Sequence, residues 1–139
     1  MSKNFKLQLV APDHPAITQE VNLVVLPGQM GEFGVMGGHM SLLSTLKPGT
    51  LRVVRDHERE LYFVAGGFAE VNASSVTVLA EEYVKADEID VQEAQKLKKY
   101  SEEQLAEKKE GVDLKAAQLS LARAEARLKV VEEAKASKH

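Results

Sequence analysis

The amino-acid sequence predicts an α+β protein, in which an N-terminal antiparallel β-sandwich or flattened barrel of about ten short strands precedes a C-terminal antiparallel α-helical hairpin. Three observations lead to this fold class: short alternating runs, turn residues between them, and a change of composition near residue 87. All glycines except Gly111 and all four prolines lie before Ala80, whereas residues 87–139 consist mainly of good helix formers. We therefore expect two domains, 1–86 and 87–139.

The predicted strands are short runs in which apolar and polar residues alternate. A period of two places every second side chain on the same face of a strand, so each run has one face to bury. The residues expected on these faces are Phe5, Leu7, Leu9, Val21, Leu23, Val25, Leu51, Val53, Leu61, Phe63, Ala65, Val76 and Val78. Many short strands within about 85 residues are typical of a sandwich or flattened barrel.

Turn-forming residues separate these runs. The candidate turns are 12–15, 27–28, 47–50, 56–59 and 72–75. Within one of them, Pro48 and Gly49 have the order that a type II turn requires. Gly66 and Gly67 occur inside a predicted strand, where glycine weakens the ladder, so they indicate a bulge or a close approach of two backbones.

After residue 87 the sequence predicts two helices. Asp90 with Glu93 resembles a capping box, Asp113 can cap the second helix, and the first helix is expected to end near Gly111. The residues at helical spacing are Ala94, Leu97, Ser101 and Leu105 in the first helix, and Leu114, Ala117, Leu121, Ala124, Leu128 and Val131 in the second. Burying so thin a stripe contributes only a few kcal/mol at about 25 cal/mol per Å². We therefore expect a hairpin that can be displaced or extended.

Composition restricts the classes of function. With 139 residues, 44% of them hydrophobic, the chain can bury a real core. The absence of cysteine excludes thiol catalysis and zinc–thiolate sites and fits a reducing compartment. No segment has the length of a signal-peptide core or a membrane span, so we expect a soluble chain that is not exported. A net charge of −3 with interspersed signs provides no basic field for nucleic acid and favours protein partners.

Residues 28–40, GQMGEFGVMGGHM, are the most unusual stretch. A phosphate-binding Walker loop requires a lysine and a hydroxyl directly after its glycines, and neither follows Gly38 in that arrangement. The glycines also lack the G-x-G step of a dinucleotide-binding fingerprint. Two interpretations remain, because the apolar residues of this stretch can fill the core or form a docking surface around Glu32 and His39. These residues are Met30, Phe33, Val35, Met36 and Met40; for Val35 and for Leu42, Leu43 and Leu46 beyond it we expect the core.

Catalytic and metal sites find no support in the sequence. The four histidines are scattered and contain no i, i+4 pair of the kind that binds metal. Ser41 lies two residues from His39 but lacks the flanking glycines of a nucleophile elbow. The carboxylates of Asp87, Glu88 and Asp90 are more simply explained by a helix N-terminus, whose dipole they complement, than by acid–base catalysis or calcium binding. We therefore predict no catalytic residue and no metal.

The order of these features resembles one known family. The stretches LPGQMGEFGVMGGHMSLLSTLKPGTLRVV and FVAGGFAEVNASSVTVLAEE, followed by a helical tail that opens with DEID, are similar to the epsilon subunits of bacterial F-type ATP synthases, the counterparts of the mitochondrial delta subunit. The elements G-E-F-G, G-H and L-x-x-L-K-P-G are specific in combination, and the resemblance covers the whole chain.

The resemblance implies a non-catalytic rotor subunit, peripheral on the cytoplasmic face of a bacterial inner membrane. In this family the sandwich binds the gamma subunit and sits on the c-ring, so that ring rotation is coupled to the shaft. The residues that match the c-ring contact are Gly31, Glu32, Phe33 and Gly34, with Glu32 as the ionic contact. Those that match the gamma contact are His39, Met40, Ser41, Leu42 and Leu43. Outside the resemblance, a small independent enzyme and an adaptor for another coiled partner stay open.

The resemblance also implies that the hairpin alternates between a folded-down state and an extended state that reaches the alpha and beta subunits and inhibits ATP hydrolysis. Such a change requires two packings of one stripe that differ by only a few kcal/mol. The implied inhibitory contacts are Arg123, Arg127 and Lys129. The alternative is that these cations are solvated, with Glu125 and Lys129 forming an ordinary i, i+4 pair.

Some relatives bind ATP in the folded-down hairpin, and the resemblance carries part of that motif to this chain. The matching residues are Ile89, Asp90, Ala94, Arg123 and Arg127. Glu93 stands where the motif has arginine, and a carboxylate repels a triphosphate that a guanidinium would attract. We therefore predict weak or absent ATP binding and no bound cofactor.

Overall fold

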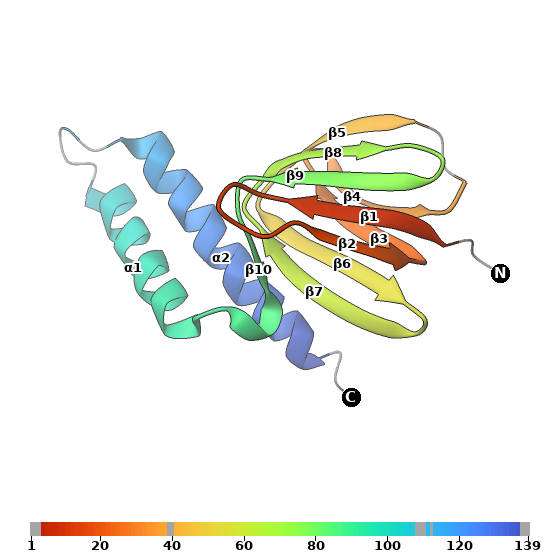
Figure 1. Ribbon diagram of the computed structural model, residues 1–139. Coiled ribbons are helices and arrows are strands. Elements are labelled where there is room, and N and C mark those ends of the chain that lie inside the picture. Colours follow the sequence, from red (N-terminus) through yellow and green to blue (C-terminus); the bar gives the residue numbers. More distant parts are fainter. Residues whose placement is uncertain (1–3, 39–40, 108–110, 112, 137–139) are drawn as a thin grey trace.

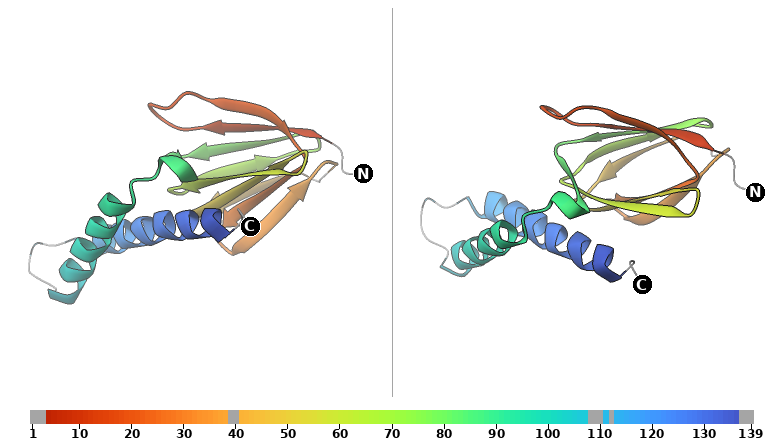
Figure 2. Two further views of the ribbon diagram at one scale, coloured as in Figure 1. Left: turned by 90° about the horizontal axis from the view of Figure 1, so that it is seen from below. Right: turned by 60° about the horizontal axis from the view of Figure 1, so that its bottom comes forward.

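The computed structural model describes residues 4–38, 41–107, 111 and 113–136, and it confirms the predicted fold class. Ten strands form one sheet, and two long helices lie on one side of it, α2 next to the sheet and α1 beyond α2 (Figure 1). The further views show the sheet curled into two facing layers (Figure 2).

The bounds of the elements are as follows. The strands are β1 (Phe5–Val10), β2 (Ile17–Val21), β3 (Leu23–Gly28), β4 (Gly31–Met36), β5 (Leu42–Leu46), β6 (Gly49–Arg55), β7 (Glu58–Val64), β8 (Gly67–Val71), β9 (Ser75–Ala80) and β10 (Tyr83–Lys85). A short 3₁₀ turn, η1 (Ala86–Glu88), leads to α1 (Val91–Glu107) and then to α2 (Leu114–Ala136).

The sheet runs in the order β10-β7-β6-β3-β5-β8-β9-β1-β2, and β4 pairs with β3 outside this path. Neighbouring strands are antiparallel as predicted, except that β1 and β9 run parallel. A parallel pair needs a long crossover connection, and these two strands have most of the sandwich sequence between them.

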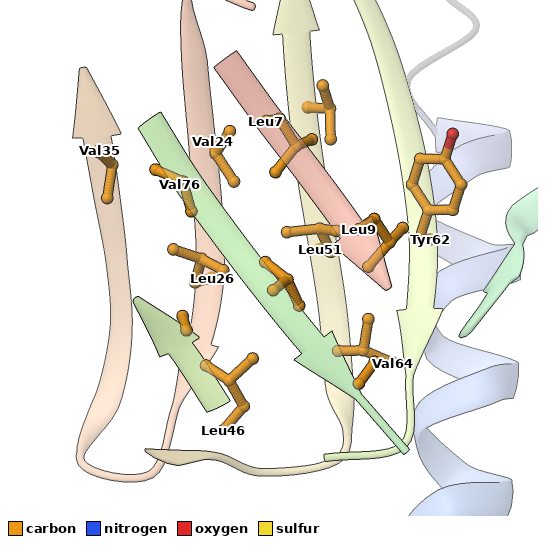
Figure 3. Packing of buried hydrophobic residues seen from close by; sticks show 14 of the residues in the cluster. Leu7, Leu9, Val24, Leu26, Val35, Leu46, Leu51, Tyr62, Val64 and Val76 are labelled. Carbon is orange, nitrogen blue, oxygen red and sulfur yellow. The ribbon is translucent and has the colours of Figure 1, made fainter. Parts of the chain in front are cut away.

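The sandwich core lies between the two layers (Figure 3). As the alternation predicted, Leu7 and Leu9 of β1, Leu51 of β6 and Val76 and Val78 of β9 are completely buried. All members of the core cluster come from residues 5–83, so the sandwich builds its core without the helices.

The predicted run 21–25 is wrong in phase. The chain bends at Asn22, and Val24 and Leu26 enter the core whereas Leu23 and Val25 are only half-buried. Asn22 stabilises the bend, because its backbone N–H donates to the Val54 carbonyl at 2.8 Å and its side-chain oxygen accepts from the Asp56 N–H at 2.7 Å. The bend shifts the alternation by one residue and so exchanges the two faces.

Strand β7 is buried on both faces. Tyr62 and Val64 belong to the sandwich core, whereas Leu61, Phe63 and Ala65, which the alternation assigned to that core, face the helices instead. They pack against apolar side chains of α2 and of the segment that leads from β10 to α1, which are Ala126, Val130, Ala134, Val84, Ala86 and Ile89. Alternation reveals that a face is buried but not what covers it.

Backbone geometry at three places explains residues that the sequence singled out. Asp56 and His57 have φ of 50° and 73°, the left-handed pair of a type I′ hairpin. Gly49 does not have the positive φ of a type II turn; its Cα lies against Pro27, and an added Cβ would be 2.7 Å from the Pro27 Cβ. Gly67 marks the predicted close approach, since an added Cβ would lie 2.0 Å from the Leu79 carbonyl oxygen.

Both predicted helix caps are present. The Glu93 N–H donates to Asp90 Oδ1 at 3.0 Å, and the Ala116 N–H donates to Asp113 Oδ1 at 3.1 Å. Helix α1 is described as far as Glu107, and residues 108–110, which precede the expected end near Gly111, lie outside the described residues. The two helices pack through small buried residues, which are Ala94, Ser101, Ala117 and Ala124. Among the described residues, neither helix combines the length and apolar composition needed to cross a bilayer.

Candidate interaction surfaces

Residues Gly31 to Gly34 form the first part of strand β4, which lies at a sheet edge and pairs with β3. Glu32 is exposed, while Phe33 is half-buried and packs against the sandwich core. The tip of the β3–β4 hairpin is Gln29 and Met30, and the Met30 side chain is 99% exposed. The predicted c-ring contact and the adjoining hairpin tip thus expose one carboxylate, that of Glu32, and one apolar side chain, that of Met30.

Arg52 of β6 connects this edge to helix α2. Its Nη1 donates to Glu32 at 2.7 Å, its Nη2 donates to Glu133 at 2.8 Å, and its Nε also donates to Glu133. The guanidinium therefore holds Glu133 in a two-point contact and Glu32 in a one-point contact. Sequence reasoning missed this arginine, because it looked like an outward-facing polar residue of a strand.

The two partners shift each other's pKa. The hydrogen bonds that Arg52 donates to Glu133, and to a lesser degree the one that it donates to Glu32, raise the pKa of Arg52, although partial burial acts in the opposite direction. The hydrogen bond from Arg52 lowers the pKa of Glu133, and the positive charges of Arg59 and Lys129 add to this effect. Glu133 is therefore held as a carboxylate.

The predicted gamma-facing segment lies partly outside the described residues, which do not include His39 and Met40. Ser41 is exposed, and Leu42 and Leu43 are 49% and 69% exposed, so the expectation that these leucines fill the core is wrong. Leu46 and Val35 are in the core as expected. Leu43 is on the outer face of the sheet, because its register partner on β8 is the exposed Glu70. Leu42 is opposite the buried Val71 and stays half exposed at the start of β5.

An exposed apolar strip extends from this segment over the outer face of the sheet. Phe68 of β8 and Leu79 of β9 are opposite each other in register and about half exposed. Leu43 of β5 is opposite Glu70, and so lies on the same face of the sheet, diagonal to Phe68. We call Leu43, Phe68 and Leu79 the apolar strip. The signal was available in the sequence, since Phe68 and Leu79 alternate with buried residues and must therefore face outward.

The helix cations singled out by sequence hold α2 against the sandwich. Arg123 pairs with Glu81 and donates to the Ala65 carbonyl at 3.4 Å. Arg127 pairs with Glu82 at 2.7 Å, and its guanidinium carbon lies 4.4 Å from the centre of the Phe63 ring. The third cation, Lys129, is exposed.

The residues of the nucleotide motif are only partly brought together. Ile89, Asp90, Ala94 and Arg127 line a cavity of about 220 Å³ at the start of α1, and Arg123 does not line it. Glu82, Glu88 and Glu93 line the same cavity, so carboxylates outnumber the single guanidinium, which is already paired. Such a lining repels a triphosphate, and the volume is below the ~300 Å³ of ordinary ligand pockets.

The fold thus combines a curled sandwich that has exposed apolar and acidic side chains with a helical hairpin held on one side of it. In the part of the chain that the structure describes, no group of three or more His, Cys, Asp or Glu side chains could hold a metal ion.

Comparison with known proteins identifies the family. The model of the β-sandwich domain of the ATP synthase delta/epsilon chain matches residues 4–86, and the model of its long α-helix domain matches residues 87–132. The chain therefore belongs to the ATP synthase delta/epsilon chain family.

Curated relatives named ATP synthase epsilon chain agree with this assignment. The protein from Nitratidesulfovibrio vulgaris is 43% identical over 130 residues, which cover 94% of this chain and 97% of the relative. The protein from Syntrophobacter fumaroxidans is 42% identical over 132 residues, which cover 95% and 98%.

Solved structures show the same fold. A chain in the Euglena gracilis mitochondrial ATP synthase complex of OSCP, F1 and c-ring has a TM-score of 0.69 and 26% identity, covering 98% of this chain and 82% of its own length. A chain in the central stalk and c-ring of the Tetrahymena thermophila mitochondrial ATP synthase has a TM-score of 0.57 at 12% identity, covering 96% and 97%.

Proposed function

We propose that this chain is a non-catalytic rotor subunit in the central stalk of a proton-translocating F-type ATP synthase. The match of both family domains along the chain carries this proposal. In this role the sandwich, residues 1–86, binds the gamma subunit and the c-ring, and residues 87–139 form the regulatory domain. The chain is then peripheral on the cytoplasmic face of a bacterial inner membrane, held there by the complex.

The contact with the c-ring is assigned to Gly31, Glu32, Phe33 and Gly34. The exposed carboxylate of Glu32 offers an ionic contact to a cationic loop, and the fully exposed Met30 at the adjoining tip adds an adaptable apolar contact. Pairing of β4 with β3 along its whole length gives this edge the stiffness that transmission of torque requires.

The contact with gamma is assigned to His39, Met40, Ser41, Leu42 and Leu43. The apolar strip extends this surface, because Phe68 and Leu79 continue it over β8 and β9. Exposed leucine and phenylalanine side chains lose water when a helical partner covers them, which favours a stable rather than a transient contact.

Regulation is assigned to undocking of the hairpin. The docked helix is held by a small apolar patch and by ion pairs at Glu81, Glu82 and Arg52, each of which solvent can replace at modest cost. Undocking frees Arg123 and Arg127, which together with Lys129 become available to acidic groups of the alpha and beta subunits. The hairpin then inhibits ATP hydrolysis.

ATP is not assigned as a cofactor. The acidic cavity at the start of α1 supports the prediction that the isolated chain binds ATP weakly or not at all. Titration calorimetry of the full chain with Mg-ATP is expected to show no saturable heat at micromolar concentrations. Micromolar affinity would contradict the prediction.

Two experiments test the proposed function. The chain should copurify with gamma and the c-ring, and substitution of both Leu43 and Phe68 by serine should weaken retention of gamma. The complete complex should hydrolyse ATP faster when residues after Asp87 are removed. An adaptor for a different partner would pass neither test, because neither gamma nor ATP turnover would respond to it.

A further inference from the structure

We propose that Arg52 couples the docking edge at Glu32 to the docking of the helical hairpin. A cationic group that neutralises Glu32 strengthens the hold of Arg52 on Glu133, and so keeps α2 against the sandwich. The inference rests on the proposed function in one respect, since it takes the cationic group to come from the c-ring.

The three side chains come from elements that are far apart in the sequence. Glu32 lies on β4, Arg52 on β6 and Glu133 near the end of α2, and Arg52 and Glu133 are 81 residues apart. Strand β3 lies between β4 and β6, and its Val25 is in register with both Arg52 and Gly34. Arg52 and Glu32 are therefore positioned by the sheet and stay close whether or not α2 is docked.

The two carboxylates compete for one cation. In the docked hairpin the guanidinium divides its donors, with Nε and Nη2 directed to Glu133 and Nη1 to Glu32. When Glu133 leaves, Glu32 remains as a partner for Arg52, which stabilises the undocked state. When Glu133 is present, its charge is repelled by that of Glu32. Both effects make the charge of Glu32 oppose docking.

The exposure of the two carboxylates determines which of them an outside group can reach. The Glu32 side chain is 51% exposed, against 25% for Glu133 and 20% for Arg52. A lysine or arginine of a partner can therefore reach Glu32 more readily than Glu133. Because coupling between two binding events is reciprocal, a docked hairpin also makes Glu32 a better ligand for that partner.

Other charged side chains lie near these three residues, and they are the same in the wild-type chain and in variants of Arg52, Glu133 or Glu32. Lys47, Glu125 and Lys129 line a cavity of about 270 Å³ together with Glu32 and Arg52. Arg59 and Lys129 act on Glu133 by charge. None of them donates a hydrogen bond to Glu133 or Glu32 among the contacts of the described residues, so the shared guanidinium is the connection to test.

The test measures docking in the full-length chain. The sequence contains no cysteine, so Glu70→Cys and Gln118→Cys allow one fluorophore on β8 and one on α2, both at exposed positions remote from Arg52. Single-molecule energy transfer then gives the ratio of undocked to docked hairpins. Arg52→Gln and Glu133→Gln should each raise this ratio about fivefold. Glu32→Gln should lower it by about twofold.

Controls separate coupling from general destabilisation. Arg55→Gln removes an arginine from the same strand whose hydrogen bond goes to Gln19 rather than to the hairpin, and it should leave the ratio unchanged. In the Arg52→Gln background, Glu32→Gln should lose the part of its effect that competition for Arg52 causes and keep only the part that direct repulsion of Glu133 causes. Thermal unfolding shows whether each variant is folded. If Arg52→Gln does not fold, the ratio measured for Glu133→Gln tests the proposal alone.

Two results would overturn the proposal: no change of the ratio on loss of Arg52 or Glu133, or a ratio that does not fall in Glu32→Gln. Copurification with the c-ring is measured separately. If Glu32→Gln tightens docking but the c-ring is never retained, the coupling holds and the proposed function fails. If the c-ring is retained but the ratio of undocked to docked hairpins does not change in Glu32→Gln, the proposed function holds and the coupling fails.

Discussion

Ser101 is fully buried between α1 and α2, and in the described part of the chain its hydroxyl has no hydrogen-bond partner. A buried hydroxyl without a partner costs about 1–3 kcal/mol relative to its hydration in water. The hydroxyl therefore favours separation of the helices, which exposes it to solvent. A residue selected only for packing would instead favour contact between the two helices.

We expect Ser101→Ala to stabilise the hairpin by about 1 kcal/mol, because alanine removes the unsatisfied group and is the better helix former. Hydrogen exchange of α1 amides in the full chain measures the change as slower exchange. Ser120→Ala on α2, where the side chain is half-buried, serves as the control and should have a smaller effect. Faster exchange in Ser101→Ala would show that the hydroxyl has a partner in solution.

Glu133 makes docking depend on pH. Its pKa is lowered from the usual 4.5, chiefly by the hydrogen bond from Arg52. A carboxyl whose pKa is lower in the docked state contributes stability above its ordinary pKa and loses it as pH falls through the lowered value. The undocked fraction should therefore rise as the pH is taken below 4.5, and the Glu133→Gln variant should lack this part of the rise. Parallel titration curves for the two chains would refute the assignment.

At the scale of elements, α2 has two apolar faces where the sequence predicted one. Ala117 and Ala124 of the predicted stripe are buried toward α1, whereas Ala126 and Val130 face β7. Val131, which was also predicted in the stripe, lines a cavity beside Leu61 of β7. Two small faces on one helix explain why it can be held by either neighbour. Leaving the sandwich does not require leaving α1.

Val130→Ala should therefore release α2 from the sandwich without unfolding the helix. Val130 is completely buried against β7, and its truncation costs about 1–2 kcal/mol of docking while alanine favours helix. Small-angle scattering should show a larger radius of gyration with unchanged circular dichroism. Leu119→Ala, at a position of α2 that is 43% exposed, should change neither measurement. Loss of helical signal would contradict this account.

At the scale of the whole molecule, the hairpin covers a face of the sandwich that is otherwise apolar. Leu61, Phe63 and Ala65 are buried in the full chain, but they do not belong to the sandwich core. Each undocking event exposes them to water unless a partner covers them. The extended state therefore carries its own cost, which biases an isolated chain toward docking.

A chain of residues 1–86 should fold, because its core is independent of the helices, but it should self-associate through this exposed face. Sedimentation velocity of this fragment is expected to show concentration-dependent dimers or larger species. Phe63→Gln in the fragment should restore the monomer. A monomeric unsubstituted fragment would mean that the face is too small to associate.

The sequence by itself determined the local features of this protein. Alternation placed Leu7 and Val76 in the core, and Asp90 and Asp113 marked both helix starts, because these signals depend on neighbours within a few residues. The motif order also indicated the family, which the comparisons confirm. The assignment of the docking residues stays a prediction.

Only the tertiary structure decided which buried face meets which element. Leu61 and Phe63 were expected in the sandwich core and lie under α2, and a bend at Asn22 exchanged the faces of β3. The contacts of Arg52 are with Glu32, 20 positions before it, and with Glu133, 81 positions after it. Period and propensity are short-range quantities, whereas a contact between distant segments depends on sheet register and helix docking, which the whole fold fixes at once.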